Sequence, residues 1–475
     1  MRSKSPVPSC FSFLRSSSSR VQSPDPSSVP SSSPVARRAV DEKVTEDDAL
    51  PAYFADSMNL DSDDGLNDRA LETIQSAIDF YSADLREISL FISDHPELSY
   101  HEFLAHDHIT SFLSKQGFDV TKSYVIPTAF KASFTLNFKS GSLGKNGRHV
   151  GFCSEYDALP GIGNACGHNL IAIGGIAALL ATRAAMKAYR ISGTVTLFGT
   201  PAEEGGGGKI ELIKAGAFKD LDACLMVHPT AGGKKGEKGT AIITGTLAVQ
   251  QFKVQYFGKT AHAALAPWEG INALDAAVQA YSSIAMLRQQ LNPSVRVHGI
   301  ILQGGLVPNV IPDHTLMKWC ARTQSAKELD TLMAKLIDCF KAAALSTGCS
   351  YEIKMDGPAY SELRCNLPLS QAFAKVLSKM YDIPVKIDID RFEGASTDFG
   401  NITYEVPACH PDYTIPSRLG DQNHTIGFTE AARTKQAHED TLRMSAGLAG
   451  VGIRVLEDEA FAKEAKTWFN NNTKT

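Results

Sequence analysis

Two side chains that could bind a metal ion stand two positions apart in the middle of the chain. Cys166 and His168 lie in the run Gly-Asn-Ala-Cys-Gly-His-Asn, directly before the apolar segment 170–186. A thiolate and an imidazole at the start of a helix can both turn toward one cation, because Gly167 between them lets the backbone bend. Such a pair by itself is more often ordinary packing than a ligand set, so its interpretation depends on the residues that follow.

Further metal-binding side chains follow apolar segments downstream. Glu203 and Glu204 come after an apolar, β-rich run, His228 follows Ala-Cys-Leu-Met-Val, and His424 lies near the C-terminal end. Open α/β sheets place their sites at the carboxyl ends of strands, so we expect these side chains to meet there. One thiolate, three imidazoles and a carboxylate are enough to hold two divalent ions.

This set of side chains favours metal-assisted hydrolysis. Two ions can share one water, lower its pKa toward neutrality and polarise a carbonyl group. One of two adjacent glutamates can bind an ion while the other moves the proton of that water to the leaving amine. We therefore assign Glu204 to the metal and Glu203 to general-base catalysis. Sulfur favours zinc, although the residue types leave manganese and cobalt open.

Seven motifs in this chain resemble those of the M20 metallopeptidases. They are Glu-Tyr-Asp-Ala-Leu-Pro-Gly at 155–161, Ala-Cys-Gly-His-Asn at 165–169, Pro-Ala-Glu-Glu-Gly at 201–205, Gly-Lys-Thr-Ala-His-Ala-Ala at 258–264, Gly-Gly-Leu-Val-Pro-Asn-Val-Ile-Pro at 304–312, Ala-Ser-Thr-Asp-Phe-Gly-Asn at 395–401 and Asn-His-Thr at 423–425. Within that family the chain resembles the aminoacylase-like and aminobenzoyl-glutamate hydrolase branch. The resemblance extends over roughly residues 70 to 460.

The resemblance implies roles for individual residues. The metal ligands that it implies are Cys166, His168, Glu204, His228 and His424. It makes Glu203 the catalytic base. In relatives that share Gly-Lys-Thr-Ala-His, the histidine reaches the site of a partner subunit and steadies the oxyanion, so His262 is expected to act in trans in a homodimer. Asn309 either contacts substrate or oxyanion, or is a turn asparagine.

The family also implies a class of substrate, namely small amides with a free carboxylate, such as dipeptides and N-acyl amino acids. Arg322 and Arg391 could hold that carboxylate by a bidentate contact, or could be surface ion-pair residues. Many relatives have histidine at Asn164 and an acidic residue at Ile173. These departures leave open an amide-forming or acyl-exchanging enzyme on the same fold. A non-catalytic metal-binding homologue is a third alternative, against which the intact ligands and base argue.

Two domains are expected to position these residues. Apolar spacing predicts helices over 73–93 and 170–186 and strands around 130–138 and 149–153. The resemblance implies a further helix that begins at 95–98. Residues 245–357 follow a strand-helix-strand-strand-helix-strand order, with the second helix over 326–347, which predicts a ferredoxin-like α+β insert. The insert separates 66–244 from 358–475, the two halves of a dinuclear-metal α/β catalytic domain. We expect it to serve as a lid and dimerisation domain over the cleft.

Composition agrees with an enzyme that acts on small molecules. The 475 residues are 43% hydrophobic and 21% charged, and the net charge of −5 predicts neither nucleic-acid binding nor attraction to a membrane. No apolar run is expected to reach the ~20 residues that span a bilayer. Nine cysteines without a Cys-x-x-Cys pair are typical of reduced packing residues, Cys166 apart. We therefore predict a cytoplasmic location.

The first 65 residues differ from the rest of the chain. Serine and proline dominate residues 3–34, and an acidic stretch follows over 41–64. Such a segment cannot bury enough apolar surface to order itself, so we predict a disordered tail. Its arginines resemble the composition of a transit peptide, which leaves mitochondrial import as the alternative location.

Overall fold

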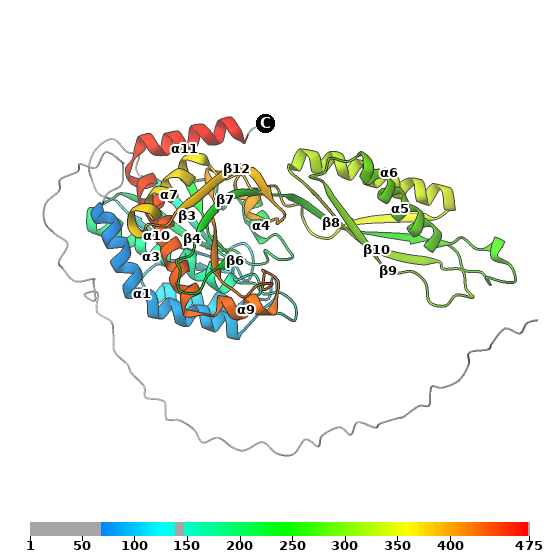
Figure 1. Cartoon of the computed structure of the whole chain (residues 1–475), viewed down its shortest axis with the longest axis horizontal. Coiled ribbons are helices and arrows are strands. Elements are labelled where there is room, and N and C mark those ends of the chain that lie inside the picture. Colours follow the sequence, from blue (N-terminus) through cyan, green and yellow to red (C-terminus); the bar gives the residue numbers. More distant parts are fainter. Residues whose placement is uncertain (1–67, 138–146, 474–475) are drawn as a thin grey trace, which may run out of the picture. The chain divides into compact units, whose positions relative to one another are not determined.

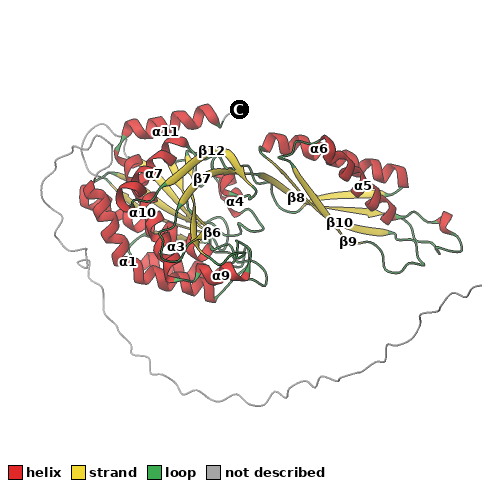
Figure 2. Ribbon diagram, viewed as in Figure 1, coloured by secondary structure: helices red, strands yellow, loops and turns green. Residues whose placement is uncertain are grey.

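The computed structural model describes residues 68–137 and 147–473 (Figure 1). The tail predicted for residues 1–65 lies outside the described residues. Within them, the strands form three sheets, and helices cover the sheets (Figure 2). The predicted two-domain α/β class is confirmed, because two of the sheets belong to a helix-rich α/β domain and the third is an antiparallel insert.

A six-stranded sheet forms the centre of the α/β domain. Its strands, in spatial order, are β1 (Asp119–Lys122), β2 (Phe130–Leu136), β4 (Gly193–Gly199), β3 (Arg148–Ser154), β5 (Ala223–Leu225) and β13 (Ala408–Cys409). The last four run parallel, whereas β1 and β2 pair antiparallel to their neighbours. The carboxyl ends of β4, β3 and β5 therefore lie side by side, and the loops that follow them meet at one edge.

The apolar segment after Cys166 forms α3 (His168–Tyr189), which is longer than the predicted 170–186. It contacts α1 (Asp68–Asp94), α10 (Lys435–Glu457) and strands β3 and β4. Residues 168–186 are all buried. By length and composition α3 is the one described helix that could cross a membrane, but its apolar window is wholly enclosed by the protein. The helix is apolar on every face because every face packs against another element.

The second helix begins later than predicted. The prediction placed its start at 95–98, but α2 comprises Phe103–Lys115. Leu98 instead pairs with Ala158 in an isolated bridge, and the Glu97 carboxylate accepts hydrogen bonds from the backbone N–H groups of Leu104 and Ala105. Glu97 thus satisfies donors at the start of α2 from outside the helix. Residues 95–102 run beside the loop that follows β3.

A second sheet and several helices complete the α/β domain. The sheet has the order β12 (Val385–Glu393), β7 (Ala241–Thr246), β14 (Asp412–Pro416) and β6 (His228–Gly233). The remaining helices are α4 (Gly208–Lys214), α7 (Leu367–Tyr381), α8 (Phe399–Ile402), α9 (Ile426–Ala432) and α11 (Glu459–Asn472). Helix α7 packs on α10, and α11 contacts both.

The insert has the predicted order of elements. They are β8 (Ala248–Phe257), η1 (Pro267–Glu269), α5 (Ala273–Leu287), η2 (Arg288–Gln290), β9 (Arg296–Gln303), β10 (His314–Thr323), α6 (Ala326–Thr347) and β11 (Ser350–Met355). The antiparallel sheet runs β11-β8-β10-β9, and α5 and α6 pack on its strands. Buried Phe252, Trp319 and Phe340 lie at the centre of this core. The domain boundaries at 66, 245 and 358 stay predictions.

Candidate metal centre

The loops after three neighbouring parallel strands bring the predicted ligands together. Asp157 follows β3, Glu203 and Glu204 follow β4, and His228 follows β5 and is the first residue of β6. Cys166 and His168 join them from the start of α3. Because these strands share one sheet edge, residues up to 71 positions apart in sequence, 157 to 228, reach the same region.

The predicted ligand atoms form a compact cluster. Cys166 Sγ lies 3.4 Å from His228 Nε2, and His424 Nε2 lies 3.3 Å from Glu204 Oε1. His168 Nε2 is 3.8 Å from Glu204 Oε1. Two overlapping groups, Cys166 with His168 and His228 and Cys166 with Glu204 and His424, each place their ligand atoms within 4.8 Å of one another. The structure therefore brings all five predicted ligands to one place.

Two backbone turns with positive φ aim these ligands. Gly167 has φ +81° and precedes α3, and a Cβ at this position would lie 2.6 Å from Pro229 Cγ. Only glycine fits both the conformation and the space. His424 has φ +67°, and its N–H donates to the Ala165 carbonyl at 2.8 Å. That hydrogen bond ties the C-terminal ligand to the loop of Cys166.

Asp157 orients one of the imidazoles. Its Oδ1 lies 3.0 Å from His168 Nδ1, which leaves His168 Nε2 facing the cluster. Its Oδ2 accepts the Glu204 N–H at 3.0 Å and the Ser99 hydroxyl at 3.1 Å. A carboxylate behind a ligand histidine fixes the tautomer and the direction of the ring.

The donor set fits divalent metal ions. His168 Nε2, Glu204 Oε1 and Glu155 Oε2 are buried and have no hydrogen-bond partner among the described residues. Buried polar atoms in proteins are nearly always satisfied, and these three face a shared space. Thiolate, imidazole and carboxylate ligands together are typical of zinc and of neighbouring transition metals rather than of calcium.

Charges in the cluster shift the pKa values of its members. Burial opposes ionisation of the Cys166 thiol, but the charge of His228 and the nearby imidazoles outweigh burial and hold the pKa of Cys166 well below its usual value. The neighbouring Cys166 and Glu204 side chains raise the pKa of His424 to about 10. A lowered pKa favours the thiolate, which is the form of cysteine that binds metal.

Glu203 lies beside the ligands in a distinct environment. Burial, followed by the charges of Glu155 and Glu204, raises the pKa of Glu203 well above its ordinary value. A carboxylate of raised pKa is suited to accept and return a proton near neutral pH. The Glu203 carbonyl accepts the Tyr360 hydroxyl at 2.7 Å, so a residue that follows the insert holds this turn.

The turn that carries Glu203 has a strained residue. Ala202 has φ +61°, a left-handed conformation that is uncommon for alanine. Its N–H donates to Glu102 Oε1 at 2.9 Å, and Thr128 donates to the other oxygen of Glu102 at 2.8 Å. Burial raises the pKa of Glu102 to about 7. The surrounding hydrogen bonds therefore hold the conformation that directs Glu203.

Several buried residues of the site were missed by the sequence prediction. Glu155, Lys209 and Asp398 form a buried ion-pair cluster beside His168. His410 is buried, its ring lies 5.8 Å from that of His228, and neither ring nitrogen has a partner within the described chain. Glu155 and Asp398 stand inside motifs already identified at 155–161 and 395–401. For Glu155 and His410, a polar residue directly after an apolar strand was the signal that could have found them.

His262, predicted to be catalytic, and Asn309, predicted to bind substrate, lie together on the insert. His262 pairs with Val310 in an isolated bridge, and the Ala263 N–H donates to the Asn309 carbonyl at 3.0 Å. His262 and Asn309 are both exposed. In the described part of one chain, neither forms a hydrogen bond or ion pair with the ligand cluster. Their predicted roles stay predictions.

The two arginines proposed for substrate binding make other contacts. Arg322 on β10 donates to Ser396 Oγ at 2.9 Å and to the Gly394 carbonyl at 3.3 Å. Arg391 on β12 forms an exposed ion pair with Glu393 at 3.0 Å. Arg391 therefore occupies the surface ion pair that was its alternative. Arg322 contacts the segment after β12 that leads to Asp398.

The two departures from the family pattern are both buried. The Asn164 side chain donates to the Ile92 carbonyl at 3.1 Å, and Ile173 is a core residue of α3. Neither contacts a metal ligand through a side-chain hydrogen bond among the described residues.

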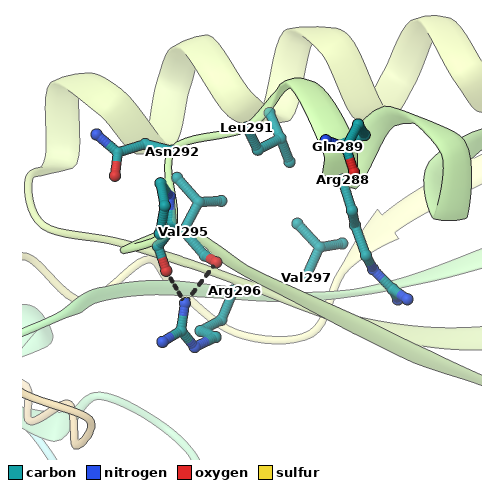
Figure 3. A pocket seen from close by; sticks show the side chains of 8 residues that line it. Arg288, Gln289, Leu291, Asn292, Val295, Arg296 and Val297 are labelled. Carbon is teal, nitrogen blue, oxygen red and sulfur yellow. Dashed lines mark hydrogen bonds between the residues drawn. The ribbon is translucent and has the colours of Figure 1, made fainter.

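A surface hollow lies away from these residues, on the insert. The hollow has a volume of about 320 Å³ and lies between the end of α5 and β9. Figure 3 shows side chains that line it, among them Arg288, Leu291 and Val297. Arg296 at its edge donates to the carbonyls of Pro293 and Val295. No carboxylate, thiol or imidazole lines it. The chemistry belongs to the ligand cluster, because only there, within the described residues, do metal ligands and a candidate base converge.

This fold and cluster place the protein among metal-dependent hydrolases. Residues 151–435 match peptidase family M20/M25/M40, and the chain belongs to this family. Its members use two metal ions, and the cluster supplies candidate ligands for both.

Relatives across the chain agree with this assignment. The Xaa-Arg dipeptidase of Mus musculus is 39% identical over 85% of this chain and 92% of its own length, and that of Homo sapiens is 41% identical over 82% and 90%. One of the p-aminobenzoyl-glutamate hydrolase chains of Escherichia coli is 32% identical over 64% of each chain.

Solved structures show the same fold. A dinuclear metal-binding peptidase of the M20 family from Bacillus subtilis aligns with a TM-score of 0.56 at 18% identity, covering 79% of this chain and 99% of that one. An aminohydrolase from methicillin-resistant Staphylococcus aureus aligns with a TM-score of 0.64 at 21% identity, over 82% and 100%.

Proposed function

We propose that this hydrolase cleaves dipeptides, with Glu203 as general base beside metal ions held by the five clustered ligands. The observation that carries the proposal is the position of Glu203. It lies in the same turn as the ligand Glu204, 3.9 Å from the facing nitrogen of His168, and is itself buried. A buried base at the edge of a metal-ligand cluster is the arrangement that amide hydrolysis requires.

Each residue of the site has a defined task in this proposal. Bound divalent ions supply Lewis acidity and lower the pKa of water. Cys166, His168, Glu204, His228 and His424 hold them. Asp157 keeps His168 in the tautomer whose Nε2 faces the cluster. The Glu203 carboxylate takes a proton from the attacking water and gives it to the nitrogen of the departing amine.

The proposed substrate is a dipeptide with a basic C-terminal residue. This proposal is supported by the two Xaa-Arg dipeptidases, which are similar to this chain over more than four fifths of its length. An aromatic acyl amino acid is the second candidate, supported by the aminobenzoyl-glutamate relative. An amide-forming reaction has lost its support, because Asn164 and Ile173 face core partners rather than the cluster.

Zinc is the metal that we propose for the site. The Cys166 thiolate is a soft ligand, and imidazoles suit zinc, copper and iron, whereas carboxylate-only sites suit magnesium and calcium. Manganese and cobalt are the alternatives to be tested. A cytoplasmic location is likewise a proposal, consistent with the eight cysteines of the described chain, which form no disulfide.

We propose a homodimer in which a second copy covers the insert. Strand β9 ends the sheet order β11-β8-β10-β9, so one of its backbone edges is unpaired within the described chain. Its Ile300 and Leu302 side chains are 57% and 51% exposed. An exposed apolar edge strand promotes pairing with another chain. A partner insert would also bring a second His262, which supports the role in trans.

The test is release of free amine, detected by mass spectrometry, from a panel of substrates. The panel contains dipeptides ending in arginine, lysine, leucine and glutamate, together with p-aminobenzoyl-glutamate. Zinc-loaded and manganese-loaded wild type is compared with Glu203→Gln, which keeps the shape of the side chain but cannot act as a base. We expect release from arginine dipeptides by the wild type, a fall of ~10²-fold or more in the variant, and equal metal content.

Two outcomes would contradict the proposal. If Glu203→Gln lost its metal, the roles of Glu203 and Glu204 would be reversed. If metal-loaded wild type released no amine from any member of the panel, the non-catalytic alternative would replace the dipeptidase.

A further inference from the structure

A fully buried ion-pair cluster lies beside the metal ligands and has no role in the mechanism above. Lys209 Nζ is 2.5 Å from Glu155 Oε1 and 2.5 Å from Asp398 Oδ1. None of the three side chains has exposed surface. A lysine is almost never fully buried unless it is paired, so the buried position of Lys209 depends on its two carboxylate partners.

The second oxygen of Glu155 faces the metal site. Glu155 Oε2 is buried and has no hydrogen-bond partner within the described residues. It lies 3.6 Å from His168 Nε2, whereas Glu204 and Glu203 lie 3.8 and 3.9 Å from the same nitrogen. Glu155, His168 and Glu203 also place ligand atoms within 4.8 Å of one another. By position alone, Glu155 is as able to bind a metal ion as the glutamates of the catalytic turn.

Lys209 is the contact that distinguishes Glu155 from those glutamates. Lys209 bonds one oxygen of Glu155 and so fixes the position of the carboxylate, whereas neither Glu203 nor Glu204 has such a contact with Lys209. The lysine is itself fixed, since its backbone N–H donates to Asp398 Oδ2 at 3.0 Å. The preceding Gly208 packs closely on the turn that carries Glu203, because a Cβ there would lie 2.0 Å from the Pro201 carbonyl oxygen. The Lys209 ammonium group and the turn that carries Glu203 are therefore held in fixed positions relative to each other.

Removal of the ammonium would leave two buried carboxylates without a counter-charge. A buried charge that loses its partner must become neutral or move toward another cation. For Glu155 the neighbouring cation is a bound metal ion, because the free oxygen already faces His168 Nε2. Glu155 would then become an additional carboxylate ligand, and the metal coordination by the five clustered ligands would change.

We propose that Lys209 is a positioning residue that restrains Glu155, so that Glu204 alone supplies the carboxylate ligand of this turn and Glu203 stays free as the base. This inference rests on the proposed function of the cluster. It assigns Lys209 no contact with substrate. Its effect is on which side chains coordinate the metal.

The test compares Lys209→Met with Lys209→Met/Glu155→Gln, in protein loaded with cobalt(II), whose visible spectrum reports ligand number and geometry. Lys209→Met should change that spectrum, and its kcat should fall about 10–100-fold with a smaller change in KM, the scale of a disturbed metal environment. The double variant should recover at least about tenfold in kcat together with the wild-type spectrum. Lys214→Met, which changes an exposed lysine of the same helix, is the matched control and should behave as wild type.

Three results would overturn the inference. The first is a wild-type spectrum and kcat in Lys209→Met. The second is a double variant no better than the single one, which would mark Lys209 as purely structural. The third is loss of metal in Glu155→Gln alone, which would make Glu155 a ligand. If Lys209→Met does not fold, the double variant decides, because removal of the unpaired carboxylate is expected to restore a folded, cobalt-binding protein.

Failure of the proposed function would be visible separately. Wild type that binds cobalt but cleaves no amide would refute the dipeptidase proposal, whereas the spectra of the variants would still report whether Lys209 restrains Glu155.

Discussion

At the scale of single residues, the backbone at Gly167 decides whether Cys166 and His168 can face the same ion. The residue has φ +81° and leaves no room for a Cβ beside Pro229. Gly236 has nearly the same conformation, φ +83°, but nothing lies within 4 Å of a Cβ built there. An alanine at position 236 would therefore incur only the cost of the left-handed conformation. An alanine at position 167 would incur that cost and would also displace the metal-binding loop.

We predict that Gly167→Ala weakens zinc binding by about tenfold or more, whereas Gly236→Ala leaves it unchanged. Both variants should lose about 1–2 kcal/mol of unfolding free energy from the conformation alone. Only the change at 167 pushes the loop against Pro229 and moves two ligands. Chelator competition measures zinc affinity, and urea unfolding of the metal-free proteins measures stability. Equal zinc affinity in both variants would show that the loop can adapt.

The chemistry of individual residues was predictable only where it was repeated in a motif or followed a strand. Cys166, His168 and Glu204 stand in such motifs and lie together as predicted. Lys209 and Asp398 are 189 positions apart, and their ion pair exists only because the chain returns after the insert. No local pattern encodes such a contact. The roles of His262, Asn309 and Arg322 depend on groups outside their own elements, so sequence alone could not place them.

At the scale of elements, prediction succeeded where local signals marked both ends. Helix α6 has the predicted bounds, because the Ser325 side chain caps its first turn and Gly348 ends it at φ +78°. The start of α2 was wrong because a tertiary contact, the Leu98–Ala158 bridge, competes with helix formation over 95–102. Long apolar periodicity thus correctly indicated that these helices exist. Contacts with residues distant in the sequence shifted the start of α2 from its predicted position.

Strand β3 carries a histidine that should make stability depend on pH. His149 Nε2 is 2.8 Å from Thr196 Oγ1 on β4, and burial lowers the pKa of His149 to about 4. In the unfolded chain the imidazole has its ordinary pKa of about 6.5. Between these values the unfolded chain binds a proton that the folded chain does not. The free energy of unfolding should therefore decrease as the pH falls from about 6.5 to about 4, and this histidine should have no effect above that window.

We predict that His149→Gln removes part of this acid sensitivity, because glutamine can keep a hydrogen bond to Thr196 but does not titrate. The loss of stability between about pH 7.5 and about pH 4.5 should be smaller in the variant by up to about 3 kcal/mol. Urea unfolding of metal-free protein at both pH values measures it, since metal release in acid would otherwise add to the effect. Parallel losses in the two proteins would show that other groups control the acid transition.

At the scale of the whole molecule, one chain brings all five candidate metal ligands together but carries His262 on the insert, without a bond to those ligands among the described residues. The insert also leaves the β9 edge and its apolar side chains uncovered within the described chain. Both observations have one explanation if a second copy pairs with the insert and receives its histidine. In a symmetric dimer the exchange is mutual, so each subunit completes the site of the other.

This arrangement predicts that two inactive variants restore each other. Glu203→Gln keeps His262, and His262→Ala keeps Glu203, so a mixed dimer contains one site with both groups if the histidine acts in trans. Random exchange of equal amounts makes about half of the dimers mixed, and recovered activity should approach about a quarter of wild type. If His262 acts in its own subunit, the same mixture stays inactive, because no site then contains both groups. Subunit exchange is verified by native mass spectrometry of differently tagged chains, and a monomeric wild type in that experiment would refute the dimer itself.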